Sequence, residues 1–346
     1  MNKIGICGHF GFGKILLNGQ TIKTKIISEE IGKQFGVENI HIVDTHGGRS
    51  SLFRIIFQLV LLAYKCENVI ILPAHNGIRI MVPLLALINK VLYRKLHYVV
   101  IGGWLREFLQ TRPRLVTQLK SFKGIYVETN TMKMDMKTLG FGNVLVMQNC
   151  KTLTALDPSE LTYSYSVPYK LCTFSRVMKE KGIEDAIYAV QVVNEKEKRI
   201  VYTLDIYGQI DENYVGRFAE IRRNLPEFIQ YKGVVPFDRS VAVLRNYYAL
   251  LFPTYYDGEG LAGTILDAMA SGLPIIASDW KYNRDIVINK VTGILFESKN
   301  KQELVKSLIW AKENNDIWNQ MKLNCLYEYE QYRPEKVINV IIENLQ

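Results

Sequence analysis

The sequence predicts an α/β protein with two doubly wound parallel sheets, and two observations support this class. Short apolar runs alternate with stretches of helical periodicity, a pattern typical of parallel strands joined by helices. The chain also has 346 residues, a length that suits two domains. The alternation stops between Asn149 and Pro168, where Ser, Tyr and Thr replace the apolar pattern. We therefore expect two sheet-containing domains joined by one linker.

This break divides the chain into four segments. Residues 1–155 form the expected first domain, 156–168 the linker and 169–330 the second domain. Residues 331–346 form a final helix, which is a candidate for crossing back to the first domain.

The expected strands are short apolar runs bounded by turn residues. They are 3–8, 40–43, 69–72, 97–101, 124–127 and 144–147 in the first domain, and 169–174, 201–207, 229–231, 248–252, 275–277 and 293–296 in the second. Helical periodicity predicts helices over 51–64, 80–95, 182–193, 214–224, 240–246 and 261–270, then three helical pieces between 301 and 345. The helix over 51–64 is apolar on nearly all sides, so we expect it to pack against the sheet.

A glycine-rich turn follows the first expected strand. Gly8, Gly11 and Gly13 precede a polar helix start, and glycines at such a turn let a phosphate approach backbone N–H groups. Their order is G-x-x-G-x-G, whereas dinucleotide sites use G-x-G-x-x-G. Asp44 is the only other support for a nicotinamide cofactor, so we do not expect one.

The positive charge lies in the first half of the chain. Residues 1–165 hold 20 Lys and Arg against 10 Asp and Glu, and residues 166–346 hold 23 against 24, so +10 and −1 make up the net +9. This asymmetry favours an anionic partner, namely nucleic acid, an acidic membrane surface or a phosphorylated substrate. The alternative is a solvated basic face.

Aromatic and basic residues mix after the helix over 80–95. Trp104, Arg106, Arg112 and Arg114 are candidates for the acceptor or membrane side of the first domain, because Trp enters the headgroup region while cations meet anionic lipid. The aromatic residues of this segment are alternatively core. A single-stranded nucleic acid would also use such residues, but no nucleic-acid-binding motif accompanies them, so we expect no nucleic acid partner.

Cysteine, histidine and apolar runs exclude several classes. The five cysteines are scattered and odd in number, so we expect them to be reduced, and the five histidines lack zinc-ligand spacing. The apolar runs are too short to span a membrane. The first residues lead directly into the glycine-rich turn without a signal-peptide pattern, so we expect a cytoplasmic location.

The stretch from Leu251 to Val287 reads as strand, acidic loop, helix and strand. The loop lies where open α/β sheets bind ligands, and small residues at Gly260, Ala262 and Gly263 would let a phosphate approach the helix start. A helix that began at Gly260 would place Glu259 and Asp267 on one face, about 12 Å apart. Alternatively, Glu259 only complements the helix dipole and Asp267 is a solvated side chain.

These residues resemble glycosyltransferase family 4, a retaining, nucleotide-sugar-dependent group. EGL at 259–261 and DAMASGLPIIA at 267–277 resemble its donor signature, and FSRVMKEKG at 174–182 is similar to its diphosphate-binding turn. The glycine-rich turn and NGQT at 18–21 match more loosely. The resemblance implies the GT-B fold, in which two Rossmann-like domains face a central cleft.

The resemblance also implies roles for individual residues. Glu259 would contact the hydroxyls of the transferred sugar and Asp267 those of the ribose, while Arg176 and Lys181 would neutralise the diphosphate. His75 would face the anomeric carbon, although a hydrogen-bonded loop histidine is an equal alternative. The matched motifs imply further contacts. On the acceptor side the contact is Gln20, and on the donor side the contacts are Gly260, Leu261, Ala262, Gly263, Thr264, Gly11 and Gly13. Because an Asp-x-Asp pair is absent, we expect no metal and no cofactor beyond the donor.

The implied reaction is transfer of a hexose from a nucleotide diphosphate, expected to be uridine-based, to a lipid-linked or polysaccharide acceptor in cell-surface glycan synthesis, at the inner face of the plasma membrane. Two alternatives share the fold: a sugar-nucleotide epimerase and a non-catalytic nucleotide-sugar-binding partner of another transferase. The sequence departs from the family at Asp267, where Glu is usual, and at 280–283, where WKYN replaces a glycine pair. Both departures bear on the choice of donor.

Overall fold

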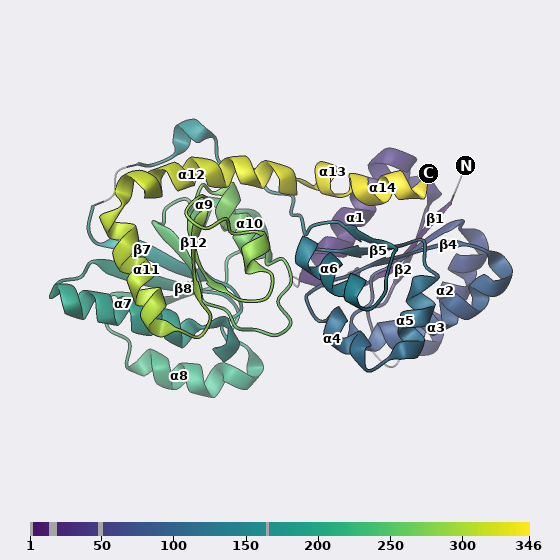
Figure 1. Cartoon of the computed structure of the whole chain (residues 1–346), viewed down its shortest axis with the longest axis horizontal. Helices are drawn as coiled ribbons and strands as arrows, with labels where there is room; N and C mark the ends of the chain where they lie inside the picture. The colour runs from purple at the N-terminus through teal and green to yellow at the C-terminus, as the bar shows by residue number, and fades with distance from the viewer. Residues whose placement is uncertain (1–2, 14–18, 48–50, 164–165) are drawn as a thin grey trace. The chain divides into compact units, whose positions relative to one another are not determined.

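A computed structural model describes residues 3–13, 19–47, 51–163 and 166–346 (Figure 1). Contacts divide the chain into two compact units: unit 1 is Met1–Thr152 with Tyr332–Gln346, and unit 2 is Leu153–Gln331. Within the described residues each unit holds a six-stranded sheet in which all paired strands are parallel. The predicted α/β class with two doubly wound sheets is therefore confirmed.

Unit 1 has the strand order β2-β1-β3-β4-β5-β6. Its strands are β1 Ile4–Gly8, β2 Ile40–Asp44, β3 Asn68–Ile71, β4 Lys95–Val99, β5 Gly124–Val127 and β6 Val144–Val146. Its helices are α1 Gly19–Phe35, α2 Leu52–Lys65, α3 His75–Leu92, α4 Leu105–Gln110, α5 Pro113–Lys120, α6 Asn130–Thr138, α13 Pro334–Val337 and α14 Asn339–Leu345. Asn18, at the predicted start of α1, lies outside the described residues.

Alternation along β1 directs its side chains to two helical layers. Ile4 and Ile6 are buried in one core cluster with residues of α1, α13 and α14. The intervening Gly5 faces α2 instead, because a Cβ there would lie 2.5 Å from Leu62 Cγ. Opposite faces of the sheet are thus covered by different helices, as expected of a doubly wound sheet.

Unit 2 has the strand order β12-β11-β10-β7-β8-β9. Its strands are β7 Tyr169–Phe174, β8 Tyr202–Tyr207, β9 Ile229–Gly233, β10 Ala249–Phe252, β11 Ile275–Asp279 and β12 Gly293–Glu297. Its helices are α7 Ile183–Glu197, α8 Val215–Arg223, α9 Ser240–Leu244, α10 Gly263–Ala270, α11 Lys301–Glu313 and α12 Asn315–Tyr329.

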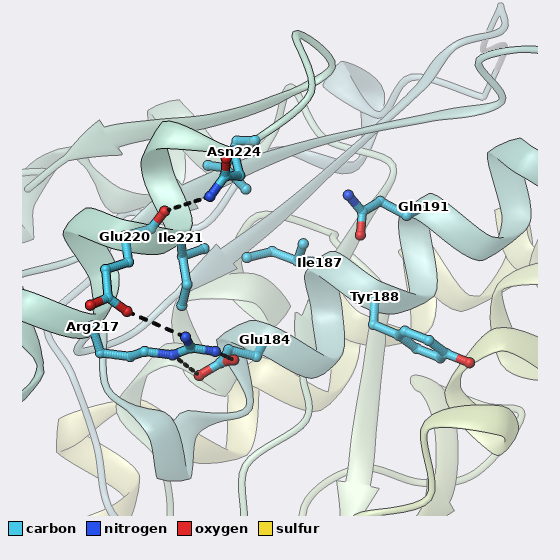
Figure 2. A pocket seen from close by; sticks show the side chains of 9 residues that line it. Glu184, Ile187, Tyr188, Gln191, Arg217, Glu220, Ile221 and Asn224 are labelled. Atoms are coloured by element: carbon cyan, nitrogen blue, oxygen red, sulfur yellow. Dashed lines mark hydrogen bonds and ion pairs between the residues drawn. The ribbon is translucent and has the colours of Figure 1, made fainter.

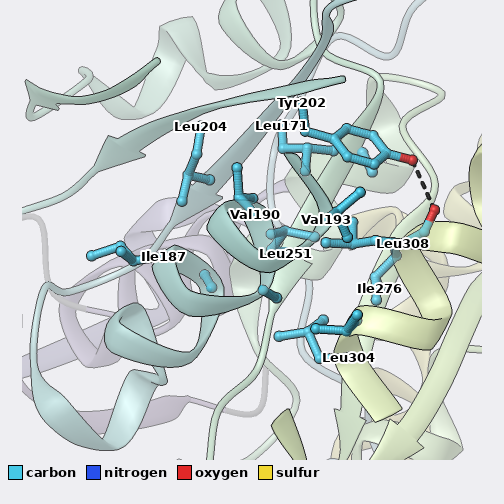
Figure 3. Close-up of a cluster of buried hydrophobic side chains, with 14 of the residues drawn as sticks. Leu171, Ile187, Val190, Val193, Tyr202, Leu204, Leu251, Ile276, Leu304 and Leu308 are labelled. Atoms are coloured by element: carbon cyan, nitrogen blue, oxygen red, sulfur yellow. Dashed lines mark hydrogen bonds between the residues drawn. The ribbon is translucent and has the colours of Figure 1, made fainter. Parts of the chain in front are cut away.

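The core of unit 2 lies between its sheet and the helices α7 and α11. Leu171, Leu204 and Leu251 from three strands meet Val190 of α7 and Leu304 of α11 in one buried cluster (Figure 3). The hydroxyl of Tyr202 crosses this layer and donates to the carbonyl oxygen of Leu308 at 2.8 Å. This packing fixes the positions of the strands whose ends carry the candidate site.

Several predicted elements differ from the structure in their bounds. The helix expected over 80–95 spans His75–Leu92, because Tyr93 adopts a left-handed conformation that ends it. The helix expected from residue 261 begins at Gly263, because Ala262 is extended and acts as the N-cap. The three helical pieces expected between 301 and 345 are four α-helices in this fully described segment, because Arg333 is extended and Pro334 starts a new helix.

The predicted linker lies largely within unit 2. Unit 2 begins at Leu153, and Leu156 N donates to the carbonyl oxygen of Ala270 at 2.8 Å. Residues 164–165 of the predicted linker lie outside the described residues.

A buried histidine joins three elements of unit 1. His97 Nδ1 lies 3.0 Å from the Tyr126 hydroxyl and Nε2 lies 3.2 Å from Asn68 Oδ1. The Asn68 amide donates in turn to the carbonyl oxygen of Leu345, at the end of α14. Burial, with Lys123 and Lys95 adding to it, lowers the pKa of His97 to about 3.

This histidine predicts loss of stability in acid. Between pH 6.5 and about 3 the unfolded chain binds a proton that the folded His97 does not, so the free energy of unfolding falls as pH falls. The slope from this one group is at most about 1.4 kcal/mol per pH unit. Urea unfolding across this window should show a shallower slope for His97→Gln than for the parent. A slope equal to that of the parent would contradict the assignment.

Candidate functional site

The candidate site lies at the carboxyl edge of the unit 2 sheet, where the strand order reverses. β7 leads to β8 on one side, and its parallel neighbour β10 leads to β11 on the other. The loops that follow these two strands therefore begin side by side and then diverge. Open α/β sheets bind ligands in the crevice at such a switch point.

A buried ion pair joins these two loops. Lys181 Nζ donates to Glu259 Oε2 at 2.5 Å, and the hydroxyl of Thr254 donates to the same oxygen at 2.9 Å. Glu259 is only 7% exposed. Lys181 Nζ also lies 5.4 Å from the ring centre of Phe252 and 5.2 Å from that of Tyr256. The ammonium and carboxylate are thus held in fixed positions.

Gly182 permits this approach of the two loops. Its φ is +70°, in the left-handed region, and an added Cβ would lie 2.2 Å from the carbonyl oxygen of Pro253. Tyr255 N also donates to the carbonyl oxygen of Glu180 at 2.7 Å. The position of Lys181 therefore depends on a backbone contact that only glycine allows.

The start of α10 lies in the same loop as Glu259. The N-cap residue Ala262 makes no side-chain capping bond, since it has no polar atom to offer. The hydroxyl of Thr264 donates to the carbonyl oxygen of Phe174 at 2.5 Å, which joins the first turn of α10 to the end of β7. A helix start without a capping side chain favours an anion at its backbone N–H groups.

Asp267 lies inside unit 2. It is 2% exposed, and its Oδ1 accepts a hydrogen bond from the Ser240 hydroxyl at 2.8 Å. The alternative of a solvated Asp267 is therefore wrong. The expectation that Glu259 and Asp267 share one face of a helix is wrong too, because the helix begins at Gly263 and leaves Glu259 in the loop.

The sequence reasoning missed Thr254 and Ser240. Thr254 follows Pro253 at the end of β10 and is fully buried, so its place after an apolar strand was the available signal. Ser240 starts α9, and nothing in its sequence surroundings relates it to Asp267, which lies 27 residues away.

Arg176 has a different partner from Lys181. Its guanidinium lies 3.5 Å from Asp211 Oδ2, on the loop after β8, and its side chain is 57% exposed. With residues 209–213 it lines a cavity of about 290 Å³. The guanidinium is therefore accessible to an anionic ligand, but the structure does not join it to the Lys181–Glu259 pair.

The loop after β11, where the sequence departs from family 4, contacts the acidic loop. Trp280 Nε1 donates to the carbonyl oxygen of Tyr256 at 2.8 Å. Lys299 Nζ lies 5.3 Å from the ring centre of Tyr255 and 5.4 Å from that of Trp280. These contacts hold the departing residues against the segment that carries Glu259.

A second surface pocket in unit 2 lies between two helices and not at the strand ends. It lies between α7 and α8, has a volume of about 380 Å³, and contains the ion pair between Glu184 and Arg217 at 2.6 Å (Figure 2). The hydrogen bond from Arg217 lowers the pKa of Glu184. Because helix side chains line it, and not the loops at strand ends, we assign it no donor contact.

In unit 1, His75 is the first residue of α3. Its ring stacks on Trp104 with centroids 3.8 Å apart, and burial, followed by the charges of Arg79 and Arg112, lowers its pKa. A neutral imidazole is favoured there. Gln20 Nε2 donates to the carbonyl oxygen of Leu72, just before this segment, at 3.1 Å.

The glycine-rich turn surrounds a carboxylate of the chain. Asp44 accepts from the backbone N–H groups of Phe10 at 2.9 Å and Phe12 at 3.0 Å. Burial raises the pKa of Asp44, but these and further backbone donors outweigh it and leave the pKa below its usual value. Gly11 and Gly13 adopt positive φ, and a Cβ added at Gly13 would meet nothing within 4 Å. The role we propose for both glycines is to let a ligand approach the backbone closely.

The basic residues of the 104–114 segment have separate positions. Arg106 lies 3.5 Å from Asp135, the Arg112 guanidinium covers the Phe108 ring at 4.0 Å, and Arg114 is exposed. Phe108 itself is buried. Trp104 remains half-buried, with its Nε1 bonded to the carbonyl oxygen of Ile101. Much of the aromatic surface of this segment is therefore internal.

The described ranges hold neither a metal-binding cluster nor a helix that could span a membrane. No cluster of three or more His, Cys, Asp or Glu side chains among those ranges is arranged to hold a metal ion. None of the helices formed by those ranges combines the length and apolar character required to cross a membrane.

Solved structures share this architecture. HepE of Anabaena, solved in complex with UDP, superposes with a TM-score of 0.77 at 15% identity and covers 99% of both chains. TarM of S. aureus superposes with a TM-score of 0.66 at 17% identity, over 84% of this chain and 58% of its own. The fold is GT-B.

Within that class, residues 164–325, a little under half of the chain, match the family model "Glycosyl transferases group 1". The family 4 resemblance is thereby confirmed. An uncharacterised glycosyltransferase of Methanocaldococcus jannaschii is 29% identical over 150 residues, 43% of this chain and 37% of the relative. The GtfA subunit of a UDP-N-acetylglucosamine–peptide N-acetylglucosaminyltransferase of Streptococcus parasanguinis is 27% identical over 53% of this chain and 36% of the relative. The chain thus spans little more than a third of these relatives.

Proposed function

We propose that this protein is a retaining glycosyltransferase that moves a hexose from a UDP-sugar to a glycan acceptor. The observation that carries the proposal is the buried Lys181–Glu259 pair at the switch point, in the same loop system as the uncapped start of α10. The UDP complex of HepE, and GtfA solved with UDP and GlcNAc, support a uridine nucleotide as the donor.

Charge stabilisation is the proposed role of the basic residues. A nucleoside diphosphate gains negative charge as it leaves, and fixed cations and N–H dipoles stabilise that charge in the transition state. Lys181, Arg176 and the backbone at Gly263 and Thr264 would supply them, with Gly260, Leu261 and Ala262 forming the approach. We propose that this set acts without a metal.

The acidic residues would orient the donor. Glu259 would accept hydrogen bonds from sugar hydroxyls, with Thr254 and Lys181 holding the carboxylate in place. Asp267 would accept from the ribose hydroxyls with Ser240 fixing its rotamer. Retention would follow from attack on the face that the diphosphate leaves, through an oxocarbenium-like state, with a donor phosphate oxygen taking the proton of the acceptor hydroxyl. His75 would face the anomeric carbon.

For the acceptor we propose a lipid-linked or polysaccharide glycan of the cell surface, with the reaction at the inner face of the plasma membrane. Gln20 and the 104–114 segment of unit 1 are the proposed acceptor side, while Gly11 and Gly13 are proposed to contact the donor. An epimerase acting on the sugar nucleotide alone, or a nucleotide-sugar-binding partner of another transferase, remains the alternative.

A donor panel followed by nuclear magnetic resonance tests this function. The protein is incubated with UDP-, GDP- and ADP-sugars, with and without glycan acceptors. Transfer should release UDP and produce a new α- or β-anomeric signal of unchanged configuration. Isomerisation of the donor without acceptor would assign an epimerase, and unchanged donors in every mixture would contradict an enzyme.

Ser240 is a positioning residue with a measurable effect. Ser240→Ala removes the hydroxyl that orients Asp267, so the KM for the donor should rise roughly 5- to 30-fold while kcat changes little. Initial rates over a range of donor concentration measure the two constants. Ser307→Ala is the matched control, because Ser307 is also a buried helical serine, and its hydroxyl donates to the Glu303 carbonyl oxygen within α11. A drop in kcat with an unchanged KM for Ser240→Ala would refute this role.

A further inference from the structure

The outer face of α2 exposes large apolar side chains. Phe53, Phe57 and Tyr64 are between 64% and 87% exposed, with Val60 and Leu61 partly exposed beside them. These positions recur every three or four residues and so lie on one side of the helix. The opposite side, with Ile55, Leu59 and Leu62, is buried. The expected packing of α2 against the sheet thus accounts for only half of its apolar surface.

α3 continues this surface. It packs against α2. α2 connects β2 to β3 and α3 connects β3 to β4, and both connections run in the same direction across the sheet. Right-handed crossovers therefore place both helices on the same face of the sheet. Leu87, Val91 and Tyr93, at and just after the end of α3, are between 64% and 83% exposed. Figure 1 shows α2 and α3 as neighbouring helices of unit 1. We call the exposed residues of the two helices the α2–α3 face.

Charge identifies the occupant of this face. Neither helix contains an Asp or Glu, while Arg54, Lys65, Arg79 and Lys90 are basic and exposed. A second copy of the chain would bring these cations together with their equivalents across a two-fold axis, which disfavours self-association. An anionic bilayer complements both features, because apolar side chains enter the headgroup region while cations meet lipid phosphates.

A recess adds to this complementarity. Leu87 and Lys90 also line a cavity of about 420 Å³ between α3 and α5, whose other wall carries Thr117 and Ser121. An apolar side chain, a cation and hydroxyl groups border one opening. Such a border suits an amphipathic lipid better than a flat protein surface.

We infer that the α2–α3 face is a docking surface for an anionic lipid bilayer. The inference concerns unit 1 alone and goes beyond the donor chemistry proposed for unit 2. It moves the membrane contact from the 104–114 segment, whose aromatic surface is largely internal, to two helices whose outer side is apolar and basic.

Co-sedimentation with vesicles tests this inference. The full chain is mixed with vesicles of equal parts phosphatidylglycerol and phosphatidylcholine, and with vesicles of phosphatidylcholine alone. Binding to the anionic vesicles at low salt, and weaker binding as salt rises, is expected. Phe53→Ser with Phe57→Ser should lower the partition coefficient about tenfold or more. Lys65→Gln with Lys90→Gln should lower it roughly fivefold for each lysine at low salt.

Matched controls lie on unit 2. Ile317→Ser with Tyr327→Ser removes two exposed apolar side chains of α12, and Lys196→Gln with Lys306→Gln removes two exposed cations, so both should bind vesicles like the parent. Circular dichroism should show folded variants, since all these side chains are on the surface, and UDP affinity should be unchanged. Absence of binding to anionic vesicles, equal loss in the controls, or dimers that disappear in the phenylalanine variant would overturn the inference.

Discussion

Lys181→Met will lower the rate of UDP release from the donor by about 10²- to 10³-fold, because it removes a fixed cation from the leaving diphosphate. It also leaves the buried Glu259 without its cation. Of the two described donors to Glu259 Oε2, the Thr254 hydroxyl is then the one that stays. Steady-state assays with the preferred donor measure the effect. Methionine keeps the length and apolar stem of the lysine, so the variant should fold. Circular dichroism checks the folded state.

The control is Lys312→Met, which removes another partly buried lysine that forms an ion pair with Glu197 at 2.9 Å in the same unit. It should retain the parent rate. Glu259→Gln should reduce turnover as Lys181→Met does, since a neutral amide orients sugar hydroxyls less well than a carboxylate. Parent-like rates for both site variants would remove the site assignment.

Gly182→Ala will destabilise unit 2 by roughly 3 kcal/mol, because alanine is strained at φ +70° and its Cβ would meet the carbonyl oxygen of Pro253 at 2.2 Å. The backbone of both loops must then shift, and donor turnover should fall with it. Urea unfolding measures the free energy, and the donor assay the activity of the remaining folded protein.

Gly216→Ala is the opposite case. Gly216 lies in α8, where a Cβ would meet nothing within 4 Å, so this change should raise the free energy of unfolding by about 0.5 to 1 kcal/mol. The two glycine variants should therefore differ in sign. A Gly182→Ala protein as stable as the parent would contradict the described approach of the loops.

The fold could be predicted because the strands are encoded locally. Each of the twelve apolar runs from 3–8 to 293–296 overlaps an observed strand, since buried parallel strands need nearly continuous apolar residues. The start of α10 was misplaced because Leu261 and Ala262 continue the apolar pattern while their backbone is still in the loop. Periodicity reports burial, and both residues are buried outside the helix.

The candidate site could be predicted only in part. The resemblance of their motifs to family 4 identified Glu259 and Lys181, but not their contact, which depends on the pairing of β7 with β10 across 78 residues. Ser240 carries no local signal for its bond to Asp267. The roles of all these residues stay predictions until they are tested.

The exposed side of α2 was beyond sequence reasoning for a physical reason. A helix that is apolar on nearly all sides has no polar face to mark the direction of solvent, so burial and docking give the same pattern. Only the packed structure distinguishes Leu62, which faces Gly5 of β1, from Phe53, which faces outward.

Calorimetric titration of the protein with UDP in EDTA tests the central claim most directly, because it asks whether the Lys181–Glu259 site holds a nucleoside diphosphate without a metal. The account predicts one bound UDP per chain, unchanged affinity in EDTA, and affinity at least about tenfold weaker for Lys181→Met. Absence of binding by UDP and by other nucleoside diphosphates, or affinity equal in Lys181→Met and the parent, would contradict it.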